Sequence, residues 1–106
     1  MREEGMASKA DADRATETIG PEEEQELLER VREGIVLHRE GKLDDARRIY
    51  KEVLAIQPCN ASALNFLGVL AHQQHQHPEA ERLIATAVVF DPQYVDAYNN
   101  LGNVFD

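Results

Sequence analysis

The sequence contains a single cysteine and no long apolar run. Cys59 cannot form an internal disulfide, which is typical of proteins in a reducing compartment. No apolar stretch approaches the roughly 18 residues that a membrane-spanning helix needs. The N-terminal residues lack the apolar segment of a secretory signal and include the acids that transit peptides avoid. These absences together predict a cytoplasmic protein that does not enter a membrane.

Basic residues are scarce as well. The chain has 11 Lys and Arg against 20 Asp and Glu, which gives a formal net charge of −9 at pH 7. Residues 61–106 contain five acids and one base. Binding a nucleic-acid backbone or an anionic lipid surface relies on clustered Lys and Arg. We therefore expect neither nucleic acid nor a membrane as a partner.

Side chains that could support catalysis are also sparse. Ser62 and Thr86 have no base and orienting group in their sequence context, so no nucleophilic site is indicated. His72, His75 and His77 follow the spacing H-x2-H-x-H, and histidine is a common metal ligand. No spaced cysteine or acid completes this set, so a solvated turn is favoured over the alternative of a metal site. We expect a protein that is not an enzyme and that has no metal or cofactor.

The sequence does contain an internal repeat with a period of 34 residues. The matching residues are Pro58 and Pro92, Ala63 and Ala97, Leu67 and Leu101, and Gly68 and Gly102. A period of this length is typical of arrays in which each unit is a pair of helices. One such unit cannot bury its apolar face alone, so the units are expected to stack.

The spacing of apolar residues predicts five helices. Pro21 suits the first turn of a helix, and the acids that follow it favour the positive end of the helix dipole. The helices are expected from Pro21 to near Gly41, over 43–58, over 61–74, from Pro78 to Pro92, and from about Tyr94 onward. The third is apolar over more than half of its circumference, as expected of an internal layer.

These helices divide the chain into two parts. Residues 1–19 are small, polar and charged, and ordering them would cost entropy that little burial could offset. We therefore expect a disordered acidic tail there. Residues 20–106 form the expected repeat domain, with repeats at 27–60 and 61–94 and a partial repeat at 95–106.

Small residues recur at fixed places in these helices. Gly34, Gly68 and Gly102 lie on the first helix of each pair, and Ala46 and Ala80 lie on the second. Small side chains allow two helices to approach closely. Because a glycine within a helix costs about 1 kcal/mol relative to alanine, the close crossing should stabilise the fold by more than that.

At these positions the sequence resembles the tetratricopeptide repeat family. The second repeat and the start of the third carry the family pattern in Leu64, Leu67, Gly68, Ala80, Ala87, Pro92, Tyr98, Leu101 and Gly102. The first repeat departs from the pattern at Arg30 and Glu33, where the family has large apolar residues, which suits a terminal repeat that faces water. The resemblance implies an all-α fold, a right-handed superhelix of about two and a half stacked antiparallel helix pairs.

The resemblance also implies a concave groove, lined by the first helices, that holds a peptide or a helix of another protein. The expected groove residues are Val31, Ile35, His38, Ser62, Asn65, Val69, His72, Asp96, Asn99, Asn100 and Asn103. Chaperone-binding members grip a C-terminal carboxylate with basic residues and asparagines. Those positions are occupied here by Val31, Ile35, Phe66, Asp96 and Asn100, so no such clamp is expected. An extended segment bound through asparagine amides, which both donate and accept hydrogen bonds, is more consistent with these residues.

A narrower resemblance implies an alternative function. The stretches LGVLAHQ and NNLGN are similar to the repeat arm of O-linked N-acetylglucosamine transferase-like proteins. In those proteins a ladder of asparagines holds substrate peptides, and Asn100 matches one rung while Phe66 occupies the preceding one. The main expectation is a non-catalytic protein–protein interaction module. The alternative is the substrate-recruiting N-terminal arm of a larger glycosyltransferase-like enzyme.

The last predicted helix has no partner helix after it. Stacked arrays usually finish with a solvating cap, yet this helix carries Leu101, Val104 and Phe105. We expect this apolar face to contact further repeats of a longer array or to pair with a second copy of the chain. Self-association is the prediction.

Overall fold

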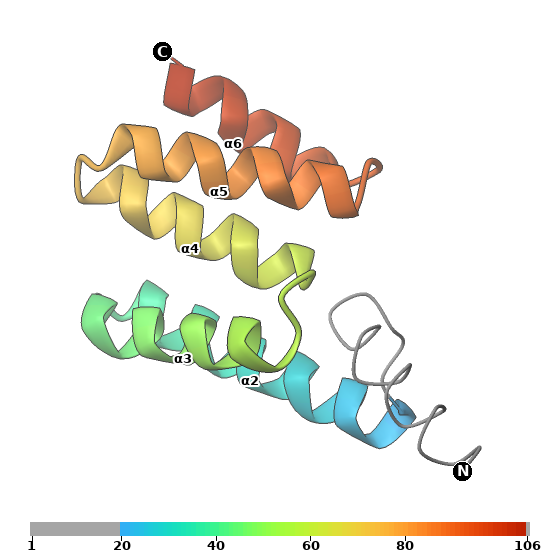
Figure 1. Ribbon diagram of the computed structural model, residues 1–106. Helices are drawn as coiled ribbons and strands as arrows, with labels where there is room; N and C mark the ends of the chain where they lie inside the picture. Colours follow the sequence, from blue (N-terminus) through green and yellow to red (C-terminus); the bar gives the residue numbers. More distant parts are fainter. Residues whose placement is uncertain (1–19, 106) are drawn as a thin grey trace, which may run out of the picture.

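Helices make up most of the described part of the chain. The structure is a computed structural model that describes residues 20–105, apart from the side chain of Phe105. The helices are α2 (Pro21–Arg39), α3 (Leu43–Ile56), α4 (Ala61–Gln73), α5 (His77–Phe90) and α6 (Val95–Phe105), labelled as in Figure 1. The all-α prediction is confirmed, and none of these helices is long and apolar enough to cross a membrane. The predicted tail, residues 1–19, lies outside the described residues.

The helices stack in neighbouring pairs. α2 packs against α3, α4 packs against both α3 and α5, and α5 packs against α6. Figure 1 shows these layers following one another, from α2 and α3 at one end to α6 at the other. α4 also contacts α2 and α6, so the first helices of successive repeats are neighbours. This arrangement confirms the predicted superhelical stack of helix pairs.

Local chemistry determines where the helices begin and end. α2 has Pro21 in its first turn, followed by three glutamates near the positive end of the helix dipole. It ends before Gly41, whose φ of +82° lies in the left-handed region that glycine adopts readily. At the start of α4, the side chain of Asn60 accepts a hydrogen bond from the backbone N–H of Ala63 at 2.9 Å. This cap satisfies a donor that the helix itself cannot.

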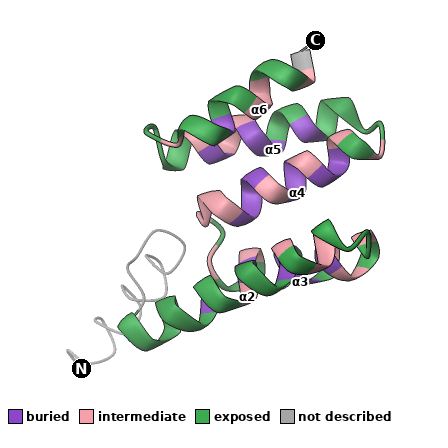
Figure 2. Cartoon of the chain, turned by 180° about the vertical axis from the view of Figure 1, so that it is seen from behind, coloured by how far each residue is buried: buried purple, intermediate pink, exposed green. Residues whose placement is uncertain are grey.

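α4 is the internal layer. Figure 2 shows buried and half-buried residues along α4, whereas α2 is largely exposed. Leu64, Leu67 and Leu70 of α4 are at most 7% exposed. They belong to one core with Tyr50 of α3 and Ile84 of α5. A smaller cluster joins α2 to this core and consists of Leu27, Val31, Val53 and Ala63.

Two helix crossings are close enough to require glycine. A methyl group at Gly34 would lie 2.7 Å from Cε1 of Tyr50. At Gly68 it would overlap Cγ1 of Ile84. The predicted close approach is thus found in the α2–α3 pair and in the α4–α5 pair. At Gly102 of α6, nothing lies within 4 Å of that position among the described residues.

An ion-pair network accounts for the departure of α2 from the apolar repeat pattern. Arg30 pairs with Glu33 at 2.7 Å and also with Glu52 of α3. Hydrogen bonds to Glu52 and Glu33 raise the pKa of Arg30 above its usual value. These side chains stay exposed to solvent, so the network joins α2 to α3 across a wet surface and contributes little stability.

Candidate partner-binding groove

Two hollows lie on the face that α2, α4 and α6 share. The first hollow lies between α2 and α4 and has a volume of about 360 Å³. Its lining residues are Ile35, His38, Arg39, Phe66, Val69 and Gln73. The ring of Phe66 stacks on that of Tyr50, with ring centroids 6.1 Å apart. Because three of its lining side chains are apolar, this hollow suits an apolar side chain of a partner.

The second hollow lies between α4 and α6 and is smaller. It has a volume of about 190 Å³ and is lined by Val69, His72, Gln73, Ile84, Asn100, Asn103 and Val104. Val69 and Gln73 line both hollows, so the two adjoin, and we refer to them together as the groove. The predicted groove residues that meet here are Val69, His72, Asn100 and Asn103.

Asn65 was predicted to line the groove but is buried, with 1% of its surface exposed. Its Nδ2 donates a hydrogen bond to the hydroxyl of Tyr94 at 3.3 Å. Its Oδ1 accepts a hydrogen bond from Nδ2 of Asn100 at 3.0 Å. A buried amide needs such partners, because an unsatisfied polar group in the interior is costly. Asn65 therefore does not reach a bound peptide, and its role is to hold the Asn100 side chain.

Val31 and Ser62 also lie away from the positions predicted for them. Val31 is 3% exposed and packs in the smaller core cluster. It stands one repeat before Asn65, so this repeat position faces neighbouring helices in both α2 and α4. Asn99 holds the same position in α6 and is exposed, because no further helix covers it within residues 20–105. Ser62 lines a separate hollow near the start of α2.

Three further residues of the groove were missed or undervalued by the sequence pattern. Arg39 and Gln73 were not predicted, and Phe66 was considered only as an occupied clamp position. Arg39 follows Ile35 by four residues and Gln73 follows Val69 by four, which places each pair on one face of its helix. This spacing was the signal that could have identified both. Of the other residues expected in the groove, Ile35 and His38 line the first hollow, whereas Asp96 lies exposed on α6 outside both hollows.

His38 links three helices beside the groove. Its Nδ1 lies 3.2 Å from the hydroxyl of Tyr50, and its Nε2 lies 2.6 Å from Oε1 of Gln73. Since Oε1 can only accept, Nε2 donates to it, and Nδ1 of the neutral ring then accepts from Tyr50. Burial raises the pKa of Tyr50 to about 12, so its hydroxyl keeps its proton at neutral pH.

The three closely spaced histidines gather where α4 ends and α5 begins. Nδ1 of His72 lies 2.9 Å from Nδ1 of His77, the first residue of α5. His75 has a φ of +64°, a left-handed conformation that reverses the chain here. Among residues 20–105, no group of three or more His, Cys, Asp or Glu side chains is placed to hold a metal ion. The histidines therefore form a polar turn at the edge of the groove.

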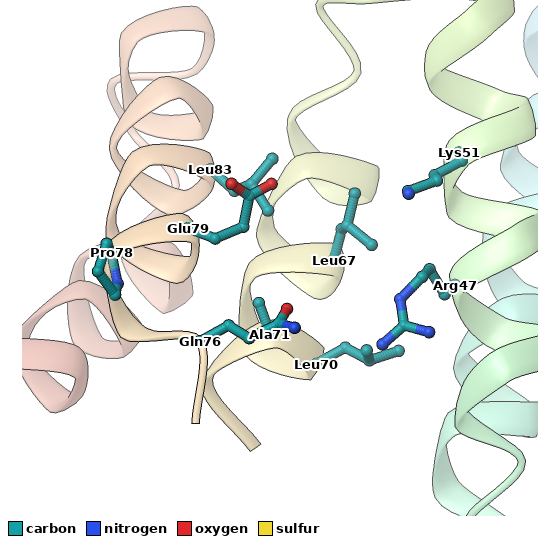
Figure 3. Close-up of a pocket in the computed structure, with 9 residues that line it drawn as sticks. All are labelled: Arg47, Lys51, Leu67, Leu70, Ala71, Gln76, Pro78, Glu79 and Leu83. Atoms are coloured by element: carbon teal, nitrogen blue, oxygen red, sulfur yellow. The ribbon is translucent and has the colours of Figure 1, made fainter. Parts of the chain in front are cut away.

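Another hollow lies between α3 and α5, with α4 beneath it (Figure 3). Its volume is about 460 Å³, and its walls carry Arg47, Lys51 and Glu79. Arg47 pairs with Asp44 at 3.0 Å, and Glu79 pairs with Arg82 at 2.7 Å. The leucines of its floor are at most 7% exposed. Because two of its three charged groups are already paired within the chain, this hollow is a weaker candidate than the groove.

α6 exposes a surface that the corresponding residues of α4 bury. Tyr98 is 48% exposed and Val95 is 68% exposed, whereas Leu64, one repeat before Tyr98, is 6% exposed. In α4 this side is covered by α5. We refer to Val95, Tyr98 and Gly102 as the α6 strip, and it carries no charged residue.

The residues predicted for self-association lie beside the α6 strip. Leu101 and Val104 are half-buried and pack against the core. The side chain of Phe105 lies outside the described residues.

Comparison with known proteins gives one family. Residues 37–103 match the sequence model of the tetratricopeptide repeat. The chain is also 32% identical over 71 residues to tetratricopeptide repeat protein 7B of Homo sapiens. The aligned stretch covers 67% of this chain and 8% of the human protein, so the chain matches a small part of that relative's length.

Proposed function

Because the chain belongs to the tetratricopeptide repeat family, whose repeats mediate protein–protein interaction, we propose that it is a non-catalytic module that binds a peptide or partner helix in the groove. The two hollows extend across α2, α4 and α6, so a bound segment would contact all three. A net charge of −9 supports a protein partner over a nucleic acid.

The pair formed by Asn65 and Asn100 supports this proposal most directly. The hydrogen bond from Nδ2 of Asn100 to Asn65 fixes the orientation of the Asn100 amide. Its Oδ1 is then left to accept a hydrogen bond from a backbone N–H of a bound segment. Asn103 adds a second amide one helical turn further along the same hollow. Because the Asn100 side chain is already held by Asn65, binding a segment costs less side-chain entropy.

Peptide display on the immobilised chain tests this proposal. Blocked peptides selected by the native chain should bind the Asn100→Ala/Asn103→Ala variant at least about tenfold more weakly, since two direct hydrogen bonds are removed. Gln93→Ala removes an exposed amide outside the groove and serves as the matched control. Unchanged affinity in the double variant, or an equal loss in the control, would move the binding site away from the groove. Asp96→Ala and Asn99→Ala test the predicted outer edge on α6.

A second candidate function rests on the same asparagine. Asn100, held at the groove between α4 and α6, matches one rung of the asparagine ladder in glycosyltransferase-like repeat arms. We propose the substrate-recruiting arm of such an enzyme as the alternative function. Reading the gene past the codon for Asp106 separates the two. Further repeats that lead into a catalytic domain would support the arm, and a stop codon would support a free-standing adaptor.

We also propose that the α6 strip pairs with the same strip of a second copy. A two-fold contact places the same residues of both chains against each other. The strip is uncharged, so two acidic chains can meet there without opposing like charges. No atom of the described residues occupies the space at Gly102, which leaves room for the backbone of a second helix to approach.

Sedimentation equilibrium from about 1 to 100 μM tests this pairing. The native mass should rise with concentration, and Gly102→Arg should hold the chain monomeric. Gly20→Arg is the matched control, because that position is also open but lies far from α6 in the sequence. A native chain that stays monomeric throughout would refute the pairing.

The domain boundary and the cellular location are also part of the proposal. We infer that the repeat domain begins at residue 20, after an acidic tail, and that the protein works in the cytoplasm. Limited proteolysis should then cleave within residues 1–19 before it cleaves any helix. Microscopy of the tagged full-length protein checks the location.

A further inference from the structure

Two arginines of α2 are left without a carboxylate partner on the described surface. Most other basic side chains there form an ion pair within 4.0 Å; these are Arg30, Lys42, Arg47, Arg48 and Arg82. Arg32 and Arg39 form none with any residue in the range 20–105. Both are exposed, although the chain as a whole carries a charge of −9. Such side chains remain free to bind an external anion.

Both arginines belong to the side of α2 that faces the groove. Arg39 lines the α2–α4 hollow. Arg32 stands one repeat before Phe66, which lines the same hollow from α4. Ile35 follows Arg32 by three residues and precedes Arg39 by four, so the three share one helical face. Seven residues of helix place the two arginines about 10 Å apart along the axis.

The space between the arginines is apolar. Ile35 is half-buried, and with Phe66 and Val69 it lines the α2–α4 hollow. The ring of Phe66 lies nearly parallel to that of Tyr50, at 21°, so its position is set by the core beneath it. A large apolar side chain can therefore lie in the hollow with an arginine on either side.

The acids nearest to these arginines in the sequence of α2 make other contacts. Glu29 accepts a hydrogen bond from Gln25 at 3.3 Å, and Glu33 accepts one from Arg30. Glu40 lies 3.6 Å from the ammonium group of Lys42. The guanidinium groups of Arg32 and Arg39 are therefore not paired with a carboxylate of residues 20–105, while the α6 end of the groove offers amides.

We infer that the α2–α4 half of the groove recognises an acidic–apolar segment, in which two carboxylate side chains about 10 Å apart flank a large apolar residue. This inference rests on the proposed function and names the chemistry of its partner. In a segment of polyproline II conformation, which has three residues per turn and advances about 3.1 Å per residue, two acids three residues apart lie on the same side, about 9 Å from each other. Each carboxylate pairs with one guanidinium, whose fork of donors suits it.

A synthetic probe tests this recognition. The probe is Gly-Ser-Glu-Phe-Ser-Glu-Ser-Gly, blocked at both ends so that no terminal carboxylate contributes. One comparison peptide replaces both glutamates by glutamine, and another replaces the phenylalanine by serine. Calorimetric titration at low salt measures the three affinities for the full chain. The protein variant is Arg32→Gln/Arg39→Gln, and Arg48→Gln/Arg82→Gln is the control with the same change in net charge.

The native chain should bind the glutamate peptide about five- to tenfold more tightly than the glutamine peptide, as expected for two exposed ion pairs. Arg32→Gln/Arg39→Gln should lose this preference, and the control should keep it. The preference should also shrink at high salt, because exposed charges are screened. Replacing the phenylalanine should weaken binding to both protein forms alike.

Equal binding of the glutamate and glutamine peptides would overturn the inference, as would an equal loss in the control or no binding of the probe at all. A different result tests the proposed function. Displayed peptides that lack acids but depend on Asn100 and Asn103 would uphold groove binding while overturning the acidic–apolar preference. All three proteins should show the same helical circular dichroism, since the substituted arginines are exposed.

Discussion

Replacing Gly68 by alanine should destabilise the chain, although alanine is the better helix former. The added methyl group would overlap Cγ1 of Ile84 and would lie 3.2 Å from the backbone oxygen of Ala80. Ile84 is fully buried, so moving its side chain disturbs the core around it. A backbone oxygen cannot rotate away. The substitution must therefore move α4 and α5 apart.

The magnitude follows from two opposing effects. Overpacking a dense core costs about 1–3 kcal/mol. Alanine recovers about 1 kcal/mol of helix propensity relative to glycine. We expect the free energy of unfolding to fall by up to about 2 kcal/mol, which lowers the Tm of a domain of this size by up to about 15 °C.

Gly102 offers a matched control one repeat further along. Within the described part of the chain, nothing lies within 4 Å of the position that a methyl group would occupy there. Gly102→Ala should therefore stabilise a monomeric chain by up to about 1 kcal/mol. Urea unfolding followed by circular dichroism, at a chain concentration low enough to avoid self-association, measures both variants. If Gly68→Ala proved as stable as Gly102→Ala, the tight crossing of α4 and α5 would be wrong.

Three other predictions concern single side chains. Burial raises the pKa of Tyr50 from 10.0 to about 12. The stability that comes from its retained proton is therefore complete below about pH 10, and it falls by roughly 2–3 kcal/mol as the pH rises to 12. Tyr50→Phe should flatten this fall when urea unfolding is measured across pH, and an unchanged profile would contradict the prediction. His75→Gly should raise the free energy of unfolding by about 0.5–1 kcal/mol, because His75 holds a φ of +64° that glycine adopts without strain. Thermal melting measures this gain, and the control His77→Gly should show none. Arg30→Gln should cost less than about 1 kcal/mol despite two ion pairs, because those pairs are exposed, and a loss of several times that in urea unfolding would refute the argument.

Much of the fold could be predicted because the same residue types recur at the same places in successive repeats. Gly34 and Gly68 recur at the period, and each lies where a second helix crosses most closely. Apolar residues around most of the third helix indicate a layer covered on two sides, and α4 is that layer. These features depend on spacing along one helix and on side-chain size, both of which are readable in a linear sequence.

The groove was predicted less completely, because its lining depends on which helices are neighbours. Of the residues expected there, Val69, His72, Asn100 and Asn103 line the hollow between α4 and α6. Val31 was expected there too, but α2 turns it toward the core. The family pattern identifies positions that recur in every repeat. It does not identify a charged residue that occurs in one repeat only, such as Arg39.

By itself, the sequence determined the helices, the period of their pairing and the glycine at each close crossing, because these follow from residue size and helical spacing. Only the tertiary structure decided what each repeated position does. Asn65 and Asn99 are the same residue one period apart, yet one is buried between Tyr94 and Asn100 and the other is exposed. The difference arises because α6 packs over Asn65, whereas no described helix packs over Asn99. An amide in the interior must find partners within the chain, and an amide at the surface stays free to find them in another molecule.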